Sequence, residues 1–338
     1  MTTFEEAAAK VLPREVYDFF AGGSWEERSL AANARAWGDV VLAPRVLRDV
    51  SVVSLEVDLF NARLPHPVMV APMAYHALLH PEAEAATARA AAAASAVNVV
   101  SSRSSLPLEA IAAEGGSGQW FQVYVLRDRG LTREMVARAA AAGYSALVLT
   151  GDAPLLGPKM RDLRNDFVIP EAAARGNIDV PRHSPPALQD PATTWADVEW
   201  LRELTGLPVL VKGVLRPDDA RTAAAAGAAG VIVSNHGGRQ LDGAVATAVA
   251  LPHVVDALDG TLPVLVDGGI RTGVDILRAA ALGATAVLVG RPVAWALAVD
   301  GAAGVEAALR TLVADFARAM ALAGCSAIDD STRDLLAR

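Results

Sequence analysis

A polar stretch, SNHGGRQLD at residues 234–242, follows directly after the apolar run GVIV at 230–233. Histidine titrates near neutral pH, and arginine offers a fixed fork of donors that suits a carboxylate or a phosphate. The two glycines permit positive φ angles or a close approach of the backbone to another group. His236 and Arg239 are therefore candidates for a site that moves a proton and binds an anion.

Polar or glycine-containing segments follow other apolar runs in the same way. They are Ala71-Pro72-Met73-Ala74, Ser101 to Ser105, Gln122 with Tyr124, Thr150 with Asp152, Lys212, Asp267 to Arg271, and Gly290-Arg291. Any one of them could be a turn or a helix cap. Because such segments follow several of the apolar runs, they favour a shared site.

Eight short apolar runs precede these segments. They are residues 67–74, 97–102, 120–124, 146–154, 207–214, 230–238, 262–270 and 286–292. They are rich in Val and Leu and do not alternate, which is typical of strands buried on both faces of a parallel sheet. Ala/Arg/Glu segments such as 81–94 and 273–283 have helical spacing. Pro217 is placed to begin a further helix, and Gly227 and Gly283 to end two.

Eight βα units in about 250 residues predict a TIM (β/α)8 barrel, in which catalytic groups gather at the C-terminal ends of the strands. A doubly wound sheet is the alternative, but GxGxxG is absent and eight repeats are too many. The segment 155–193 is a long loop after the fourth strand, expected to act as a lid or specificity loop. Residues 1–60 predict a helical extension, and 1–338 a single domain.

The seventh and eighth strands are followed by DGGIR (267–271) and GRP (290–292). Barrels commonly bind phosphate there, through loop amides and a helix N-terminus. The alternative is a tight turn with solvated arginines. Lys212 would lie in the barrel mouth and need an anionic partner. It could form a Schiff base or be the counter-charge to a cofactor ring.

Composition excludes several classes of protein. With 53% hydrophobic and 20% charged residues the chain is not disordered, and a net charge of −8 argues against a general nucleic-acid binder. One cysteine, Cys325, gives neither a disulfide framework nor a Cys-based zinc site, so we expect no metal. The N-terminus lacks an apolar signal core, and no apolar stretch predicts a membrane span. We expect a cytoplasmic protein.

Several motifs together resemble the FMN-dependent 2-hydroxy acid oxidases and dehydrogenases. They are SNHGGRQLD, LVDGGIRTG, VLVGRP, VLVKGV, FQVY, and VMVAPMA followed by HPE. The likeness runs from about residue 13 to 325. The stretches YDFFAGGS and APMAYH resemble in particular the bacterial 4-hydroxymandelate oxidases.

The resemblance implies that FMN lies across the barrel mouth, with Lys212 near flavin N1 and the phosphate on the last two loops. The implied cofactor-binding residues are Ala71, Pro72, Met73, Ala74, Ser104, Gln122, Thr150, Lys212, Ser234, Asp267, Gly268, Gly269, Arg271, Gly290 and Arg291.

The resemblance also implies catalytic roles. His236 would be the base, and Asp152 would orient it and stabilise its imidazolium. Tyr124 would bond the substrate oxygen and Arg239 the carboxylate, while the glycines of SNHGGRQLD would bring the backbone close to the substrate.

Two positions depart from the family pattern. Phe19 stands where the family commonly has Tyr, and Lys159 stands where it has a carboxylate-binding Arg. Lys is a point charge and not a bidentate fork, so it does not replace Arg conservatively. Arg161 or Arg164 could compensate from the same loop. Otherwise, either the carboxylate is held more weakly, or the acid group of the substrate is bulkier, displaced or masked. Four residues indicate an apolar, aromatic pocket or, equally, ordinary core: Phe19, Tyr75, Leu156 and Met160.

The resemblance predicts oxidation of an (S)-2-hydroxy acid, mandelate-like if aromatic, to the 2-oxo acid. O2 would reoxidise the flavin and give H2O2, or another acceptor would do so. Three alternatives stay open: the same flavin chemistry on a masked hydroxy acid with a non-oxygen acceptor, a non-redox phosphate-binding barrel using Lys212, and a barrel that has lost catalysis. Family members are usually homotetramers or octamers.

Overall fold

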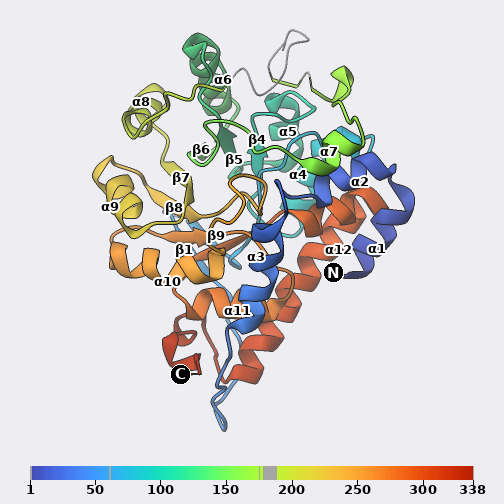
Figure 1. Ribbon diagram of the computed structural model, residues 1–338. Coiled ribbons are helices and arrows are strands. Elements are labelled where there is room, and N and C mark those ends of the chain that lie inside the picture. Colours follow the sequence, from blue (N-terminus) through green and yellow to red (C-terminus); the bar gives the residue numbers. More distant parts are fainter. Residues whose placement is uncertain (1, 61, 175, 178–188, 338) are drawn as a thin grey trace.

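Eight short parallel strands form a barrel in the computed structural model, which describes residues 2–60, 62–174, 176–177 and 189–337 (Figure 1). In chain order the strands are β3 (Val68–Val70), β4 (Val99–Ser101), β5 (Trp120–Val123), β6 (Ala146–Thr150), β7 (Val209–Val214), β8 (Gly230–Val233), β9 (Val264–Val266) and β10 (Ala286–Val289). They pair in the order β3-β10-β9-β8-β7-β6-β5-β4. A parallel bridge between Val70 and Asn98 joins the first and last of them. The predicted TIM barrel is confirmed.

Each barrel strand lies inside one of the eight apolar runs and is buried along almost its whole length. The predicted helices at 81–94 and 273–283 are α4 (Ala83–Ala93) and α11 (Gly273–Ala281). Pro217 begins α9 (Pro217–Ala225), and Gly227 and Gly283 follow α9 and α11 with φ of 79° and 101°. Local turn chemistry therefore sets these boundaries as expected.

Helices surround the barrel (Figure 1). Besides α4, α9 and α11 they are α5 (Leu108–Gly115), α6 (Arg129–Ala141), α7 (Met160–Arg164), α8 (Ala196–Thr205), α10 (Thr247–Leu258) and α12 (Arg291–Ala323). The N-terminal extension forms α1 (Thr2–Val11), α2 (Arg14–Ala21) and α3 (Arg28–Asp39). Short 3₁₀ turns lie at His76–Leu78, Glu171–Ala173, Ile328–Asp330 and Arg333–Leu335.

A small antiparallel hairpin, β1 (Val57–Leu59) and β2 (Ala62–Leu64), was not predicted. Leu59 joins the apolar cluster inside the barrel, which includes Met69, Trp120 and Leu210. The ring of Phe60 lies 5.4 Å from that of Trp120, the first residue of β5. The hairpin therefore covers the end of the barrel at which the strands begin, and the opposite end is left to the loops.

Helix α12 is long and apolar enough to cross a membrane by length and composition, yet most of that apolar stretch is buried inside the protein. It breaks at Asp300 and Gly301, where φ of Gly301 is 50°. It contacts α1, α4 and α11. These contacts account for its apolar character through packing within the fold.

The long loop after β6 carries α7 and the turn Glu171–Ala173, and α7 contacts α2 (Figure 1). Residues 175 and 178–188 of the predicted lid lie outside the described residues. The loop and the N-terminal extension thus meet beside the carboxyl ends of the strands, where the candidate site lies.

Candidate active site

The loops after the strands enclose a cavity of about 910 Å³. Pockets for small molecules and cofactors usually measure roughly 300–1,000 Å³. All the predicted site residues line it except Asp152, Ser104 and Ser234. The lining includes Phe19, Ala71, Pro72, Met73, Ala74, Gln122, Tyr124, Thr150, Lys159, Lys212, His236, Arg239, Asp267, Gly268, Gly269, Arg271, Gly290 and Arg291.

His236 is held by its side chain and by its backbone. Its Nδ1 lies 3.0 Å from Oδ1 of Asp152, and its backbone N–H donates to Oγ of Ser234 at 3.0 Å. Its φ is 58°, in the left-handed region that non-glycine residues rarely occupy. When Nδ1 carries the proton shared with Asp152, Nε2 is the nitrogen that can accept another.

Asp152 is suited to remain an anion. Burial favours its neutral form, but the interaction with His236 and the charge of Lys212 outweigh burial and lower the pKa of the carboxyl. Although Asp152 does not line the cavity, it reaches it through His236. The pair can therefore accept a proton at Nε2 and stabilise the resulting imidazolium.

Glycine is required at positions 237 and 238 for different structural reasons. Both have positive φ, 63° at Gly237 and 77° at Gly238. Gly237 lines the cavity, as expected. Gly238 does not; a Cβ there would lie 2.5 Å from the backbone N of Leu30 in α3. The expectation that both glycines approach the substrate is wrong for Gly238, whose small size serves packing.

Arg239 lines the cavity, and its guanidinium carbon lies 5.3 Å from the ring centroid of Phe19. Its Nη1 donates to the backbone carbonyls of Phe19 and Gly22 at 2.7 and 2.8 Å. Within the described residues its Nε and Nη2 donate no hydrogen bond. The guanidinium is thus fixed on one side and can bind a carboxylate with the other.

Lys159 points into the same region, with Nζ 5.7 Å from the centroid of Phe19. Burial, and then repulsion by Arg239, lower the pKa of Lys159 to about 8, with Asp162 opposing the shift. Arg161 cannot compensate, because it is bonded to Glu27 at 2.7 and 2.6 Å and does not line the cavity. Arg164 is exposed and does not line it either. Neither arginine is therefore placed to compensate for Lys159.

The wall beside these cations is aromatic. The Phe19 ring lies 5.4 Å from Phe167 and 6.3 Å from Tyr75. Leu156 also lines the cavity, whereas Met160 does not. Tyr124 faces the same space with the guanidinium of Arg103 5.3 Å from its ring, and burial raises the pKa of its phenol, which keeps it protonated.

Lys212 is a buried ammonium with partners on both sides. Its Nζ lies 3.0 Å from Oδ2 of Asp267 and donates to Oγ of Ser234 at 2.7 Å. Burial alone would lower the pKa of Lys212, but Asp267 and Asp152 raise it above the ordinary value. A Schiff-base lysine needs a neutral amine, so the geometry favours a fixed positive charge. Ser234 is thus a support for Lys212 and His236.

Gln122 is fixed at both ends of its amide. Ser101 donates to its Oε1 at 3.1 Å, and its Nε2 donates to Oγ1 of Thr150 at 2.9 Å. Ser101 lines the cavity, whereas Ser104 points away and donates to the carbonyl of Leu106 at 2.8 Å. The predicted place of Ser104 in the cavity wall is wrong, and Ser101 stands there.

The cavity is strongly positive around Arg291. Burial and the charges of Arg239 and Arg271 lower the pKa of Arg291 to about 9. Arg291 donates to the carbonyls of Phe20 at 2.9 Å, Gly237 at 3.1 Å and Gly22 at 3.0 Å. A bound anion would relieve the repulsion among these guanidiniums. The sequence did not show that Arg291 also ties two other backbone segments, at Phe20 to Gly22 and at Gly237, to the start of α12.

FMN fits this cavity. The crowded guanidiniums and the N-terminus of α12 at Gly290 suit a phosphate dianion. Gly268 and Gly269, with φ of 85° and 95°, line the same cavity. Oδ1 of Asp267 is buried and has no hydrogen-bond partner among the described residues, so a donor on a ligand can satisfy it.

Comparisons with known proteins agree with this geometry. Residues 8–338 match the FMN-dependent dehydrogenase family. The chain is 47% identical to 4-hydroxymandelate oxidase of Amycolatopsis orientalis, covering 98% of this chain and 96% of that one, and 46% identical to L-lactate oxidase of Nostoc sp., covering 97% and 94%. A solved mandelate oxidase with (S)-4-hydroxymandelic acid superposes with a TM-score of 0.94 at 47% identity, covering 98% and 97%. The chain therefore belongs to the FMN-dependent dehydrogenase family, and its cofactor is FMN.

Proposed function

We propose that the protein oxidises an (S)-2-hydroxy acid with an aromatic side chain, such as mandelate, to the 2-oxo acid. The observation that carries the proposal is the His236–Asp152 pair in the same cavity as Arg239 and Lys159. The relatives named as 4-hydroxymandelate oxidase and L-lactate oxidase support the reaction class. The aromatic wall around Phe19 supports the side chain.

FMN, when bound, would supply the oxidant and take up the hydrogen of the substrate's Cα together with its two bonding electrons. Arg271, Arg291 and the backbone of Gly268 and Gly269 would hold its phosphate, and Lys212 would place a positive charge beside its ring. Such a charge stabilises an anionic reduced ring. Ala71 to Ala74, Gln122 and Thr150 would form the wall against which the ring lies.

The protein's own groups bind the substrate and take its proton. Arg239 and Lys159 bind the carboxylate, which directs the 2-hydroxyl toward His236 and Tyr124. His236 takes the hydroxyl proton at Nε2, and Asp152 stabilises the imidazolium that forms. Tyr124, kept protonated by burial, donates to the substrate oxygen.

The acceptor is O2 in this proposal, and H2O2 is the second product, because the relatives cited above are named as oxidases.

Lys159 lies in the cavity beside Arg239, which supports a free carboxylate over a masked one. The buried Lys212–Asp267 pair disfavours a Schiff-base barrel, and the intact His236–Asp152 pair disfavours a barrel without catalysis.

Anaerobic mixing of the yellow holoenzyme with each enantiomer of mandelate tests the proposal. We expect (S)-mandelate to bleach the flavin and (R)-mandelate to leave it oxidised. Failure of every 2-hydroxy acid to bleach the flavin would refute the reaction class. Readmission of air should then restore the colour with one H2O2 for each 2-oxo acid.

We also propose that the protein works in the cytoplasm as a homotetramer. The segment after α3 exposes Val46, Leu47 and Val52 at 80%, 102% and 78%, which supports burial against further subunits. Light scattering on the purified protein would give the mass of the assembly, and cell fractionation its location.

A further inference from the structure

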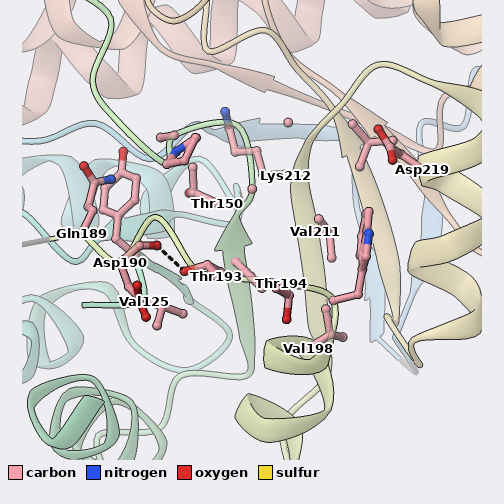
Figure 2. Close-up of a pocket in the computed structure, with 18 residues that line it drawn as sticks. Val125, Thr150, Gln189, Asp190, Thr193, Thr194, Val198, Val211, Lys212 and Asp219 are labelled. Atoms are coloured by element: carbon pink, nitrogen blue, oxygen red, sulfur yellow. Dashed lines mark hydrogen bonds between the residues drawn. The ribbon is translucent and has the colours of Figure 1, made fainter. Parts of the chain in front are cut away.

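A second cavity, here called the side chamber, lies beside the main one and measures about 230 Å³. It is bounded by the carboxyl ends of β6 and β7 and by the start of α8. Tyr124, Thr150 and Lys212 line both cavities, so these three residues stand between them. Figure 2 shows Thr150 and Lys212 on one side of the side chamber, with Thr194 and Val198 on the opposite side.

The side chamber suits a small and neutral molecule. Val125, Val198 and Val211 form apolar parts of its wall. Its one basic lining residue, Lys212, already has Asp267 as partner. Of its two lining carboxylates, Asp190 is paired with Arg129 at 3.2 Å, and Asp219 lies in the first turn of α9. The chamber is also smaller than most pockets for organic ligands, which measure roughly 300–1,000 Å³.

Gln189 is the unusual member of this wall. Its side chain is 2% exposed, and among the described residues neither its Nε2 nor its Oε1 has a hydrogen-bond partner. Buried amides are normally satisfied, and this one can both donate and accept. A small molecule that also donates and accepts therefore matches it.

We propose that the side chamber is the passage through which O2 reaches the reduced enzyme and H2O2 leaves it. The inference rests on the proposed oxidase function. O2 takes two electrons and two protons from the reduced enzyme, becomes H2O2 and leaves a fully oxidised enzyme. The apolar walls suit O2, the Gln189 amide suits H2O2, and the main cavity stays free for the 2-oxo acid.

Narrowing the side chamber tests the inference without touching the substrate site. Val198→Phe and Thr194→Phe each place a ring in the chamber, and Glu203→Phe places the same ring on the exposed face of α8 as a control. A filled chamber leaves little room in a close-packed interior, so both should lower the rate constant for reoxidation by O2 at least about fivefold. Anaerobic flavin reduction should be unchanged in all three, and reoxidation unchanged in Glu203→Phe. Thr194 lines the chamber but is exposed, so its variant still serves if Val198→Phe does not fold.

Crystals of the holoenzyme under xenon pressure give a readout independent of turnover, because xenon occupies apolar cavities. We expect xenon in the side chamber of the wild type and none there in Val198→Phe. Xenon confined to the main cavity, or reoxidation within about twofold of wild type in both narrowing variants, overturns the inference. Loss of anaerobic reduction in the wild type would instead refute the proposed function.

Discussion

Nδ1 of His236 lies 3.0 Å from Oδ1 of Asp152, although 84 positions separate the two residues in the chain. Asp152 follows β6 and His236 follows β8, and β7 lies between these strands. The parallel order of the barrel brings the two loops to one rim. The carboxylate then decides which imidazole nitrogen remains free to accept a proton.

Asp152→Asn should leave the imidazole in place and remove the charge that stabilises its protonated form. We expect flavin reduction to slow by ~10²-fold or more, with FMN affinity unchanged. Stopped-flow absorbance under anaerobic conditions measures the first quantity, and fluorescence titration of the apoprotein the second. A variant that reduces its flavin at the wild-type rate would show that Asp152 is not needed for the proton transfer.

The capture of free hydroxy acids should become slower at alkaline pH, because Lys159 loses its positive charge there. Its pKa of about 8 means that the ammonium is charged below pH 8 and neutral above it. The second-order rate constant for flavin reduction by free hydroxy acids should therefore fall as pH rises through about 8. Lys159→Arg should remove this pH dependence and lower the apparent dissociation constant of mandelate about fivefold, or about 1 kcal/mol, through a bidentate contact.

Esters or amides of the same acids are the control, because they lack the negative charge. Their reduction kinetics should not respond to Lys159→Arg or show the pH dependence near pH 8. If free acids and esters respond alike, Lys159 does not bind the carboxylate.

Arg271→Ala and Arg291→Ala should both weaken FMN retention, but with different structural cost. Loss of one charge-assisted contact to the phosphate is worth roughly 1.5–3 kcal/mol, or about 10–150-fold in the dissociation constant. Arg291 also bonds the carbonyls of Phe20, Gly22 and Gly237. Only Arg291→Ala should therefore lower the melting temperature of the apoprotein. Unchanged flavin occupancy of both variants after dialysis would remove these arginines from the phosphate site.

Lys212→Met should destabilise the apoprotein by about 3–5 kcal/mol, because it leaves Asp267 buried without its counter-charge. Lys212→Met with Asp267→Asn should recover part of that loss, since no buried charge is then left unpaired. Urea unfolding followed by fluorescence measures both. Equal stability of the wild type and the single variant would mean that the 3.0 Å pair contributes nothing to folding.

The barrel and the rim could be predicted because buried parallel strands have long apolar runs, and polar residues begin where each run ends. His236, Arg239 and Lys212 were found in this way. Ser104 was misplaced because a few residues after a strand decide which way a side chain points. Ser101 ends β4 and lines the cavity, while Ser104 has already turned away.

Other features depend on contacts between distant segments. Arg161 pairs with Glu27, 134 positions away, so its sequence neighbours did not show where it points. The hairpin β1–β2 has strands of three residues each, too short for a pattern. Position 238 requires glycine because Leu30 of α3 packs against it, and Gln189 stands out only because it lines the side chamber. None of these contacts leaves a local signal.

The most direct test of the account is anaerobic flavin reduction by (S)-mandelate in wild type and in His236→Ala. We predict rapid bleaching in the wild type and a rate ~10²–10⁴-fold lower in His236→Ala, because the base is lost. FMN affinity should be the same in both proteins. Bleaching of His236→Ala at near the wild-type rate, with FMN bound, would contradict the assignment of His236 as the base.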